Sequence, residues 1–174
     1  MKRIAIQGEL GSFHDITAHE YFQGEQIELI CCATFEEVFE NIKRDPTIIG
    51  ICAIENTIAG SLLHNYELLR ESGTTVVGEH KLHIEHSICC LPTDDWSTLQ
   101  EVHSHPVALM QCGKFLANHP DLKAVEAEDT AGSAAFIAQH QVHGWAAICS
   151  AYAARMYGMK AVSYTHLRAH ETLS

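Results

Sequence analysis

The chain has 174 residues, of which 47% are apolar and 19% are charged. This length suits one domain or two small lobes, and it can bury a core without disulfides or a structural metal. Eleven lysines and arginines against 22 aspartates and glutamates give a net charge of −11, which argues against a nucleic-acid or anionic membrane surface, and no apolar run approaches a membrane span.

The chain begins with a predicted strand and continues as an alternation of strands and helices. The opening MKRIAIQGELGSF has only a three-residue apolar stretch, which is typical of a strand and too short for a signal peptide. Thr34, with Glu37 three residues later, forms a capping-box pattern that predicts the start of a helix. The first half predicts strands at 3–7, 27–32 and 48–54, helices after Thr34 and over 61–70, and extended segments at 74–78 and 81–91.

The same alternation resumes in the second half of the chain. It predicts strands at 101–105, 123–128 and 145–149, a helix with apolar positions from Ala108 to Leu116, a helix after Asp129 and a helix that ends at Gly158. Strands that alternate with helices indicate an α/β fold with largely parallel sheets. We expect the chain to pass between two lobes in the extended stretch 74–91.

The cysteines and histidines do not form a pattern that predicts a metal or redox site. Seven cysteines, two pairs of them adjacent and none in a C-x-x-C motif, indicate reduced and mostly buried thiols in a cytoplasmic protein. His80, His83 and His86 are three residues apart and cannot all share one strand face. His103 and His105 lack a third ligand at zinc spacing. We therefore expect no metal.

Four predicted turns from strand to helix carry hydroxyl or amide side chains. They are Gly11–His14, Asn56–Thr57 with Gly60–Ser61, Ser104–Pro106 and Asp129–Ser133. Ligands of open α/β sheets bind beyond the carboxyl ends of strands, where helix N-termini favour anions. Such turns around one cleft would suit a small dicarboxylate, although each turn alone is also explained as an ordinary N-cap.

Gln111 adds a polar side chain to the third of these turns. It lies seven residues after Ser104, so a helix that starts near Pro106 points it back toward the same end and face. Between the core positions Ala108 and Cys112, Gln111 is either a satisfied core amide or a donor to a ligand.

Five segments of the sequence resemble the catalytic domain of prephenate dehydratases. They are GELGSFHDITA at 8–18, AIENTIAGSLLHNYELL at 53–69, VHSHPVALMQCGKFL at 102–116, EDTAGSAAFIAQ at 128–139 and AAICSAYAARMYGM at 146–159. They occur in the order of the family and span about residues 1–161. The resemblance implies a two-lobed α/β fold of the type 2 periplasmic-binding-protein kind, with largely parallel sheets and the active site in the cleft between the lobes. It assigns residues 1–78, with the chain end, to one lobe and 79–160 to the other.

The resemblance also implies a reaction, the decarboxylating dehydration of prephenate to phenylpyruvate in phenylalanine biosynthesis. Loss of one carboxylate as CO2, together with the ring hydroxyl, makes the ring aromatic, so no cofactor is expected. The protein must hold two carboxylates, exclude water and help the hydroxyl leave. By resemblance, the catalytic residues are Asn56, Ser104 and Gln111, the substrate-binding residues are Ser12, Thr57 and Thr130, and His105 is assigned to structure.

The chain departs from the family near its end. The family carries a Thr-Arg-Phe motif after the last strand, which supplies a proton donor and a partner for a carboxylate, and this sequence contains no Thr-Arg-Phe. The stretch VSYTHLRAHETLS, residues 162–174, shows no strand or helix pattern and resembles a translated sequencing adapter; a divergent natural tail is the alternative. We therefore expect a truncated catalytic domain, without the regulatory phenylalanine-binding domain, that is inactive or weak.

Two other functions are compatible with the same residues. An arogenate dehydratase performs the same chemistry on the amino-acid analogue of prephenate. A non-catalytic module of the same fold would bind a small anion without converting it. We expect a small-molecule partner rather than a nucleic acid or a membrane, and a homo-oligomer for the full-length protein.

Overall fold

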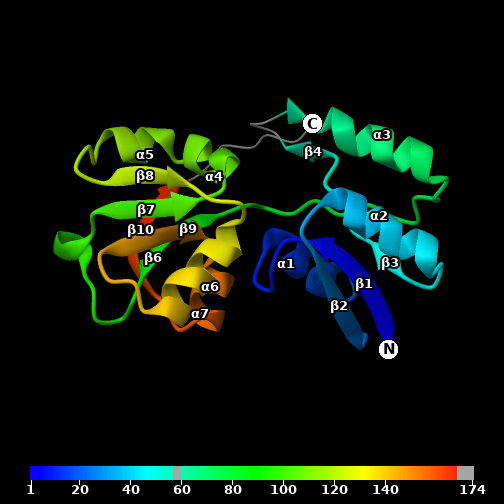
Figure 1. The fold of residues 1–174 in the computed structure, drawn as a ribbon, viewed down its shortest axis with the longest axis horizontal. Coiled ribbons are helices and arrows are strands. Elements are labelled where there is room, and N and C mark those ends of the chain that lie inside the picture. Colours follow the sequence, from blue (N-terminus) through cyan, green and yellow to red (C-terminus); the bar gives the residue numbers. More distant parts are fainter. Residues whose placement is uncertain (57–59, 168–174) are drawn as a thin grey trace. The chain divides into compact units, whose positions relative to one another are not determined.

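A computed structural model describes residues 1–56 and 60–167 of the chain, with side chains through residue 162 (Figure 1). The described residues form two compact units. Among the described residues, unit 1 comprises Met1–Glu9 and Phe13–His83, and unit 2 comprises Leu10–Ser12 and the chain from Ile84 to Leu167. The division between His83 and Ile84 lies five residues beyond the lobe boundary expected at residue 78. The short loop Leu10–Ser12 belongs to unit 2, which the sequence did not indicate.

Unit 1 is built on three parallel strands in the order β2-β1-β3. Its elements are β1 (Lys2–Gln7), α1 (Phe13–Tyr21), β2 (Ile27–Cys32), α2 (Phe35–Arg44), β3 (Ile49–Gly50), β4 (Glu55–Asn56), β5 (Gly60–Ser61) and α3 (Leu63–Ser72). Side chains alternate across the strands, so Ile4 and Ile6 of β1 pack on the α1 side, and Ala5 packs with Val38 of α2 on the other face. Thr34 caps α2, with its hydroxyl accepting from the Glu37 N–H at 3.3 Å, as the capping-box pattern predicts.

Unit 2 contains a five-stranded sheet in the order β10-β6-β9-β7-β8. Its elements are β6 (His86–Cys90), a 3-10 turn (Trp96–Thr98), β7 (Glu101–Ser104), α4 (Pro106–Gln111), α5 (Gly113–Ala117), β8 (Lys123–Glu126), α6 (Thr130–His140), β9 (Trp145–Cys149), α7 (Ala151–Met156) and β10 (Lys160–Leu167). Strand β7 runs parallel to β8 and β9, whereas β6 runs antiparallel to β9 and β10.

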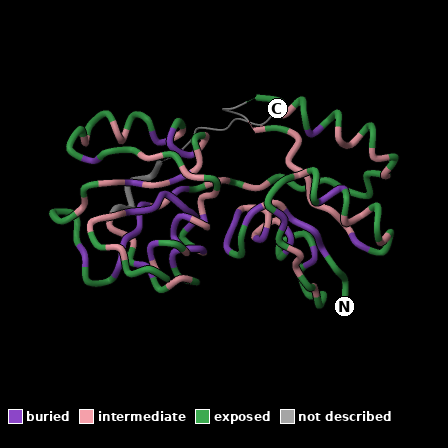
Figure 2. Tube along the Cα trace, in the orientation of Figure 1, coloured by how far each residue is buried: buried purple, intermediate pink, exposed green. Residues whose placement is uncertain are grey.

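Helices cover both faces of the unit 2 sheet. Its central strands β6 and β9 are mostly buried (Figure 2). Ala146 and Ile148 of β9 pack with α4 on one face, while Ala147 and Cys149 pack with α6 and α7 on the other. The run WAAIC is apolar at every position because both faces of this strand are covered. The sequence prediction of an α/β fold with largely parallel sheets is thereby confirmed.

Two predicted elements differ from the structure in extent. The predicted strand 48–54 is shorter in the structure, where β3 comprises only Ile49–Gly50. An apolar run indicates burial but does not establish strand pairing, and residues 51–54 are half-buried without being part of a strand. The predicted helix from Ala108 to Leu116 is divided at Cys112 into α4 and α5. Gly113 follows the break, and glycine inside a helix costs about 1 kcal/mol relative to alanine.

The expectation that no strand continues from Val162 is wrong. Strand β10 extends to Leu167 and pairs antiparallel with β6, with Lys160 opposite Cys90 and register shifts after Ala161. An edge strand needs only backbone pairing on one side, and valine, tyrosine and threonine favour extended backbone even without an alternating apolar pattern.

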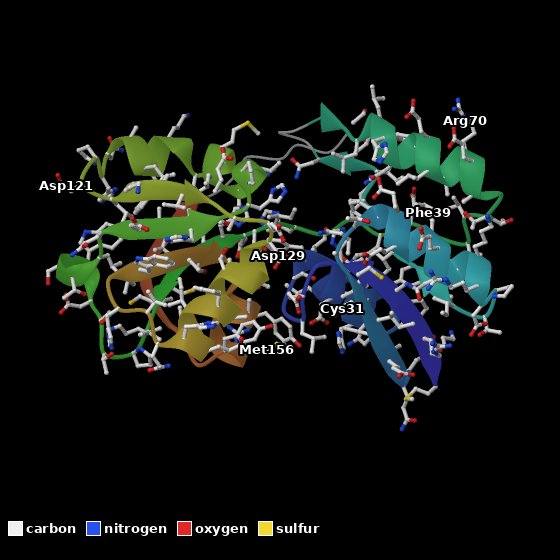
Figure 3. All side chains as sticks on the ribbon, in the orientation of Figure 1. Cys31, Phe39, Arg70, Asp121, Asp129 and Met156 are labelled. Atoms are coloured by element: carbon white, nitrogen blue, oxygen red, sulfur yellow. The ribbon has the colours of Figure 1, made fainter. Side chains whose placement is uncertain are left out.

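The cysteines are mostly buried, as predicted. All seven lie in the described part of the chain and none is in a disulfide; five of them are buried. Cys52 is intermediate, and Cys31 is exposed on β2 (labelled in Figure 3). Burial raises the pKa of Cys112 to about 12 and that of Cys52 to about 11, so these thiols stay protonated near neutral pH.

Candidate functional site

Most of the predicted site residues lie at one edge of the unit 2 sheet, namely the edge that is formed by the ends of its strands and not by an outer strand. The parallel strands β7, β8 and β9 all end there, at Ser104, Glu126 and Cys149. Because β6 is antiparallel to β9, with Ser87 opposite Cys149, its first residue His86 reaches the same edge. The carboxyl ends of parallel strands are where α/β folds bind ligands.

Ser104 is fully buried at the end of β7. Its Oγ donates a hydrogen bond of 2.7 Å to the backbone carbonyl of Ile148 in β9. The pairing of β7 with β9 ends at His103 opposite Ala147, so this carbonyl lies one residue beyond the last paired position. The hydroxyl therefore completes the ladder, and its hydrogen is committed to a backbone acceptor.

Gln111 ends α4, and its Oε1 lies 2.6 Å from Nε2 of His86. The bond brings Gln111 to the edge where Ser104 lies, as the seven-residue spacing predicts. Sequence reasoning missed His86, which was considered only as a possible metal ligand. Its burial, 7% exposed at the start of a strand, depends on a tertiary contact that sequence spacing does not reveal.

The helices that start at this edge have side-chain caps. The carboxylate of Asp129 (labelled in Figure 3) accepts from the Gly132 N–H at the start of α6, where Thr130 is half-buried. His105 Nδ1 accepts from the Val107 N–H at 3.2 Å, which gives His105 the structural role expected of it. The ordinary N-cap interpretation therefore holds for both turns.

The loop Leu10–Ser12 packs against α7 of unit 2. Ser150 Oγ donates to the Gly11 carbonyl at 3.2 Å, and Tyr157 donates to the Leu10 carbonyl at 2.5 Å. Gly11 has a φ of +90°, and a Cβ there would lie 3.1 Å from the Cβ of Ala153. This contact holds Ser12, which is 3% exposed, beside the end of β9.

Unit 1 carries the remaining predicted residues. Asn56 ends β4 and is half-buried, while Thr57 lies outside the described residues. His14, near the start of α1, packs edge-on against Phe35 with ring centroids 5.3 Å apart. Desolvation by burial lowers the pKa of His14 to about 4, and a hydrogen bond with the Gln7 backbone opposes the shift.

Within residues 1–56 and 60–167, no cluster of three or more histidine, cysteine, aspartate or glutamate side chains could hold a metal ion. No helix among them is long and apolar enough to cross a membrane. The polar groups at the unit 2 edge include hydroxyls, an amide and imidazoles as well as the Asp129 carboxylate, which is bound to the Gly132 N–H, and a few such polar groups are typical of a small-molecule site.

Comparison with known proteins gives consistent matches. A bifunctional chorismate mutase/prephenate dehydratase of Escherichia coli K12 is 32% identical over 160 residues, which cover 91% of this chain and 42% of that protein. Arogenate dehydratase 3 of Arabidopsis thaliana is 35% identical over 159 residues, covering 91% of this chain and 37% of that protein. The chain thus spans about two fifths of the length of these curated relatives.

Solved structures share the fold. A prephenate dehydratase from Arthrobacter aurescens, in complex with L-Phe, superposes with a TM-score of 0.83 at 19% identity, covering 92% of this chain and 54% of that one. GqqA, described as a quorum quenching acylase, gives a TM-score of 0.80 at 28% identity, covering 92% of this chain and 58% of that one.

The model of one family covers almost the whole sequence. It is that of prephenate dehydratase, and it matches residues 4–169, past the boundary expected at residue 161. Together with relatives that are 32–35% identical, this match shows that the chain belongs to the prephenate dehydratase family.

Proposed function

We propose that residues 1–161 form the catalytic domain of a prephenate dehydratase. The observation that carries the proposal is the gathering of Ser104, Gln111 and the Ser12 loop at one sheet edge, in a chain that belongs to this family. The reaction converts prephenate to phenylpyruvate, CO2 and water. The C–C bond to the ring carboxylate breaks, its electron pair completes the aromatic ring, and the ring hydroxyl leaves with a proton.

The hydrogen bonds of the edge residues define the roles that we assign to them. Ser104 donates its hydrogen to the Ile148 carbonyl, so its oxygen can accept a hydrogen bond from the substrate but cannot supply the proton for the leaving hydroxyl. Gln111 accepts from His86 through Oε1, so its amide N–H groups are the part that can donate to a substrate oxygen. We assign Asn56 to catalysis, and Ser12, Thr57 and Thr130 to substrate binding.

The proton donor of the family is the residue that this sequence lacks. Since no Thr-Arg-Phe is present, we expect the chain to bind prephenate but to convert it slowly. The interpretation of residues 162–174 as a non-native tail stays a prediction. Sequencing the source gene past codon 162 tests it: a Thr-Arg-Phe segment in the genuine reading frame would support it, and VSYTHLRAHETLS in that frame would contradict it.

A direct assay tests the function. Prephenate is titrated into the purified chain by calorimetry, and phenylpyruvate is followed by its absorbance in alkali, for the 174-residue chain and for a version that carries the family's Thr-Arg-Phe segment. We expect binding by both and substantial turnover by the second only. Gln111→Ala should weaken binding, while Gln139→Ala, an exposed glutamine on α6, should not. Absence of prephenate binding by both proteins would refute the function, and full turnover by the 174-residue chain would refute the need for the motif.

Arogenate dehydratase is the second candidate, favoured by the 35% identity to Arabidopsis arogenate dehydratase 3. The same assay with arogenate, read out as phenylalanine, separates the two substrates by their kcat/KM values. A chain that binds prephenate and releases no CO2, even with the motif restored, would instead be a binding module. We place the protein in the cytoplasm, in keeping with its free and mostly buried thiols, and expect the full-length protein to be a homo-oligomer.

A further inference from the structure

The contact between His86 and Gln111 joins two polar residues that are 25 positions apart in the sequence. His86 is buried at the first position of β6, and Gln111 is the last residue of α4. Their Nε2 and Oε1 atoms are 2.6 Å apart, slightly shorter than most N–H···O hydrogen bonds. The antiparallel course of β6 is what brings the histidine to the edge where the parallel strands end.

The chemistry of the two atoms fixes the direction of this bond. A glutamine Oε1 carries no hydrogen, so His86 must donate from Nε2. Desolvation by burial lowers the pKa of His86, and the hydrogen bond with Gln111 only partly opposes this, so the ring is neutral near pH 7. A neutral ring that donates from Nε2 is held in one tautomer, with the hydrogen on Nε2.

The same bond determines which end of the Gln111 amide points where. The oxygen and nitrogen of a glutamine amide have nearly the same shape, so packing alone does not distinguish an amide from its rotated form. The direction matters chemically, because an anion is attracted by amide N–H groups and repelled by the carbonyl oxygen. With Oε1 bound to His86, the N–H groups are directed away from His86.

We propose that His86 is a positioning residue, which fixes the Gln111 amide so that its N–H groups, and not its oxygen, serve the substrate at the edge of β7, β8 and β9. This inference rests on the proposed function for the identity of the substrate. It does not rest on that function for the state of the histidine, which can be measured without any substrate.

The first experiment measures the histidine directly. The intact chain is labelled with 15N-histidine, and the imidazole nitrogen shifts of His86 are assigned by comparison with His86→Gln. We expect a neutral ring protonated at Nε2 near pH 7, and a shift of this Nε2 signal in Gln111→Leu, which removes the acceptor. A His86 ring protonated at Nδ1, or one that is cationic near pH 7, would overturn the proposal.

The second experiment measures prephenate binding by calorimetry in four variants. His86→Leu removes the donor, whereas His86→Gln keeps an N–H donor at the same number of bonds from Cα. We expect His86→Leu to weaken binding about tenfold, in line with the loss of a hydrogen bond that orients a buried group, and His86→Gln to recover most of this loss. In the Gln111→Ala background, His86→Leu should have little further effect, because both changes remove the same interaction.

The outcomes separate the positioning role from simple structural support and from the proposed function. If His86 only supports the fold, His86→Leu should lower the thermal stability, its effect on binding should add to that of Gln111→Ala, and His86→Gln should not restore binding. Additive effects on binding, or a failure of His86→Gln to restore it, would overturn the proposal. If the wild-type chain binds no prephenate while the ring is protonated at Nε2, the proposed function fails and the fixed amide direction stands.

Discussion

Replacing Ser104 with alanine tests the claim that its hydroxyl completes the β7–β9 ladder. The side chain is fully buried, and its Oγ donates to the Ile148 carbonyl at 2.7 Å. Removal leaves a buried acceptor without this donor, which costs about 1–2 kcal/mol, and a chain of this size loses about 2–4 °C of melting temperature per kcal/mol. We therefore expect Ser104→Ala to unfold about 2–8 °C below the wild type.

The assay is urea denaturation together with calorimetry, and the matched control is Ser133→Ala. Ser133 is also buried, and its hydroxyl donates at 2.7 Å to the carbonyl of Asp129, four residues earlier in the same helical turn. That bond is local, and alanine is the better helix former, so the control should change stability by less than about 0.5 kcal/mol. Equal stability of Ser104→Ala and wild type would refute the role of the hydroxyl in the ladder.

Three further predictions concern other parts of the molecule. Gly11→Ala should lower the free energy of unfolding more than Gly24→Ala does. Both glycines have a positive φ, which costs an alanine about 1–2 kcal/mol, but at Gly11 the new Cβ also lies 3.2 Å from the Ala153 backbone, which costs about 1–3 kcal/mol more. Equal losses of unfolding free energy in urea denaturation would contradict this packing. Folding lowers the pKa of His14 from 6.5 to about 4, so between these pH values the unfolded chain binds more protons than the folded chain. As the pH falls from 6.5 to 4, the wild type should therefore lose stability relative to His14→Gln. A stability difference between the two proteins that does not change with pH would contradict the burial of His14. Cys31 alone among the thiols is exposed, so a thiol reagent should modify one cysteine rapidly, and Cys31→Ser should abolish this fast phase; a second rapid equivalent in that variant would contradict the burial of the others.

The sequence predicted the elements best where local patterns decide them. Strand β2 occupies the predicted residues 27–32, and α2 starts after its Thr34 cap, because an apolar run and a capping residue act over a few positions. Where pairing with a distant strand decides the structure, the prediction was less accurate. Strand β3 is much shorter than the apolar run that predicted it, and β10 forms by backbone pairing with β6, which is distant in the sequence.

The candidate site shows the same division between local and distant causes. The spacing from Ser104 to Gln111 predicted that the two side chains point toward the same end of the sheet. In the structure Gln111 is the last residue of α4, and it reaches that end of the sheet through its contact with His86. The partner of each residue was not predictable, since the Ile148 carbonyl and the His86 ring come from strands whose order in the sheet does not follow from periodicity. The position of Ser12 in unit 2 depends on the contact of its loop with α7, for which the sequence carries no local signal.

The hydrogen bonds at the edge where β7, β8 and β9 end show which side chains there already bind other parts of the protein, and so which of them act as ordinary helix caps rather than as donors to an anion. Asp129 and His105 use their acceptors on the first N–H groups of α6 and α4, so these turns spend part of their donors on the protein itself. Ser104 donates its hydroxyl hydrogen to the Ile148 carbonyl of the sheet, and the side-chain oxygen of Gln111 accepts a hydrogen bond from His86. With its oxygen bound to His86, Gln111 directs two amide N–H groups elsewhere, whereas the Asp129 carboxylate has no N–H to offer, so the affinity for a dicarboxylate should depend more strongly on Gln111 and His86 than on Asp129.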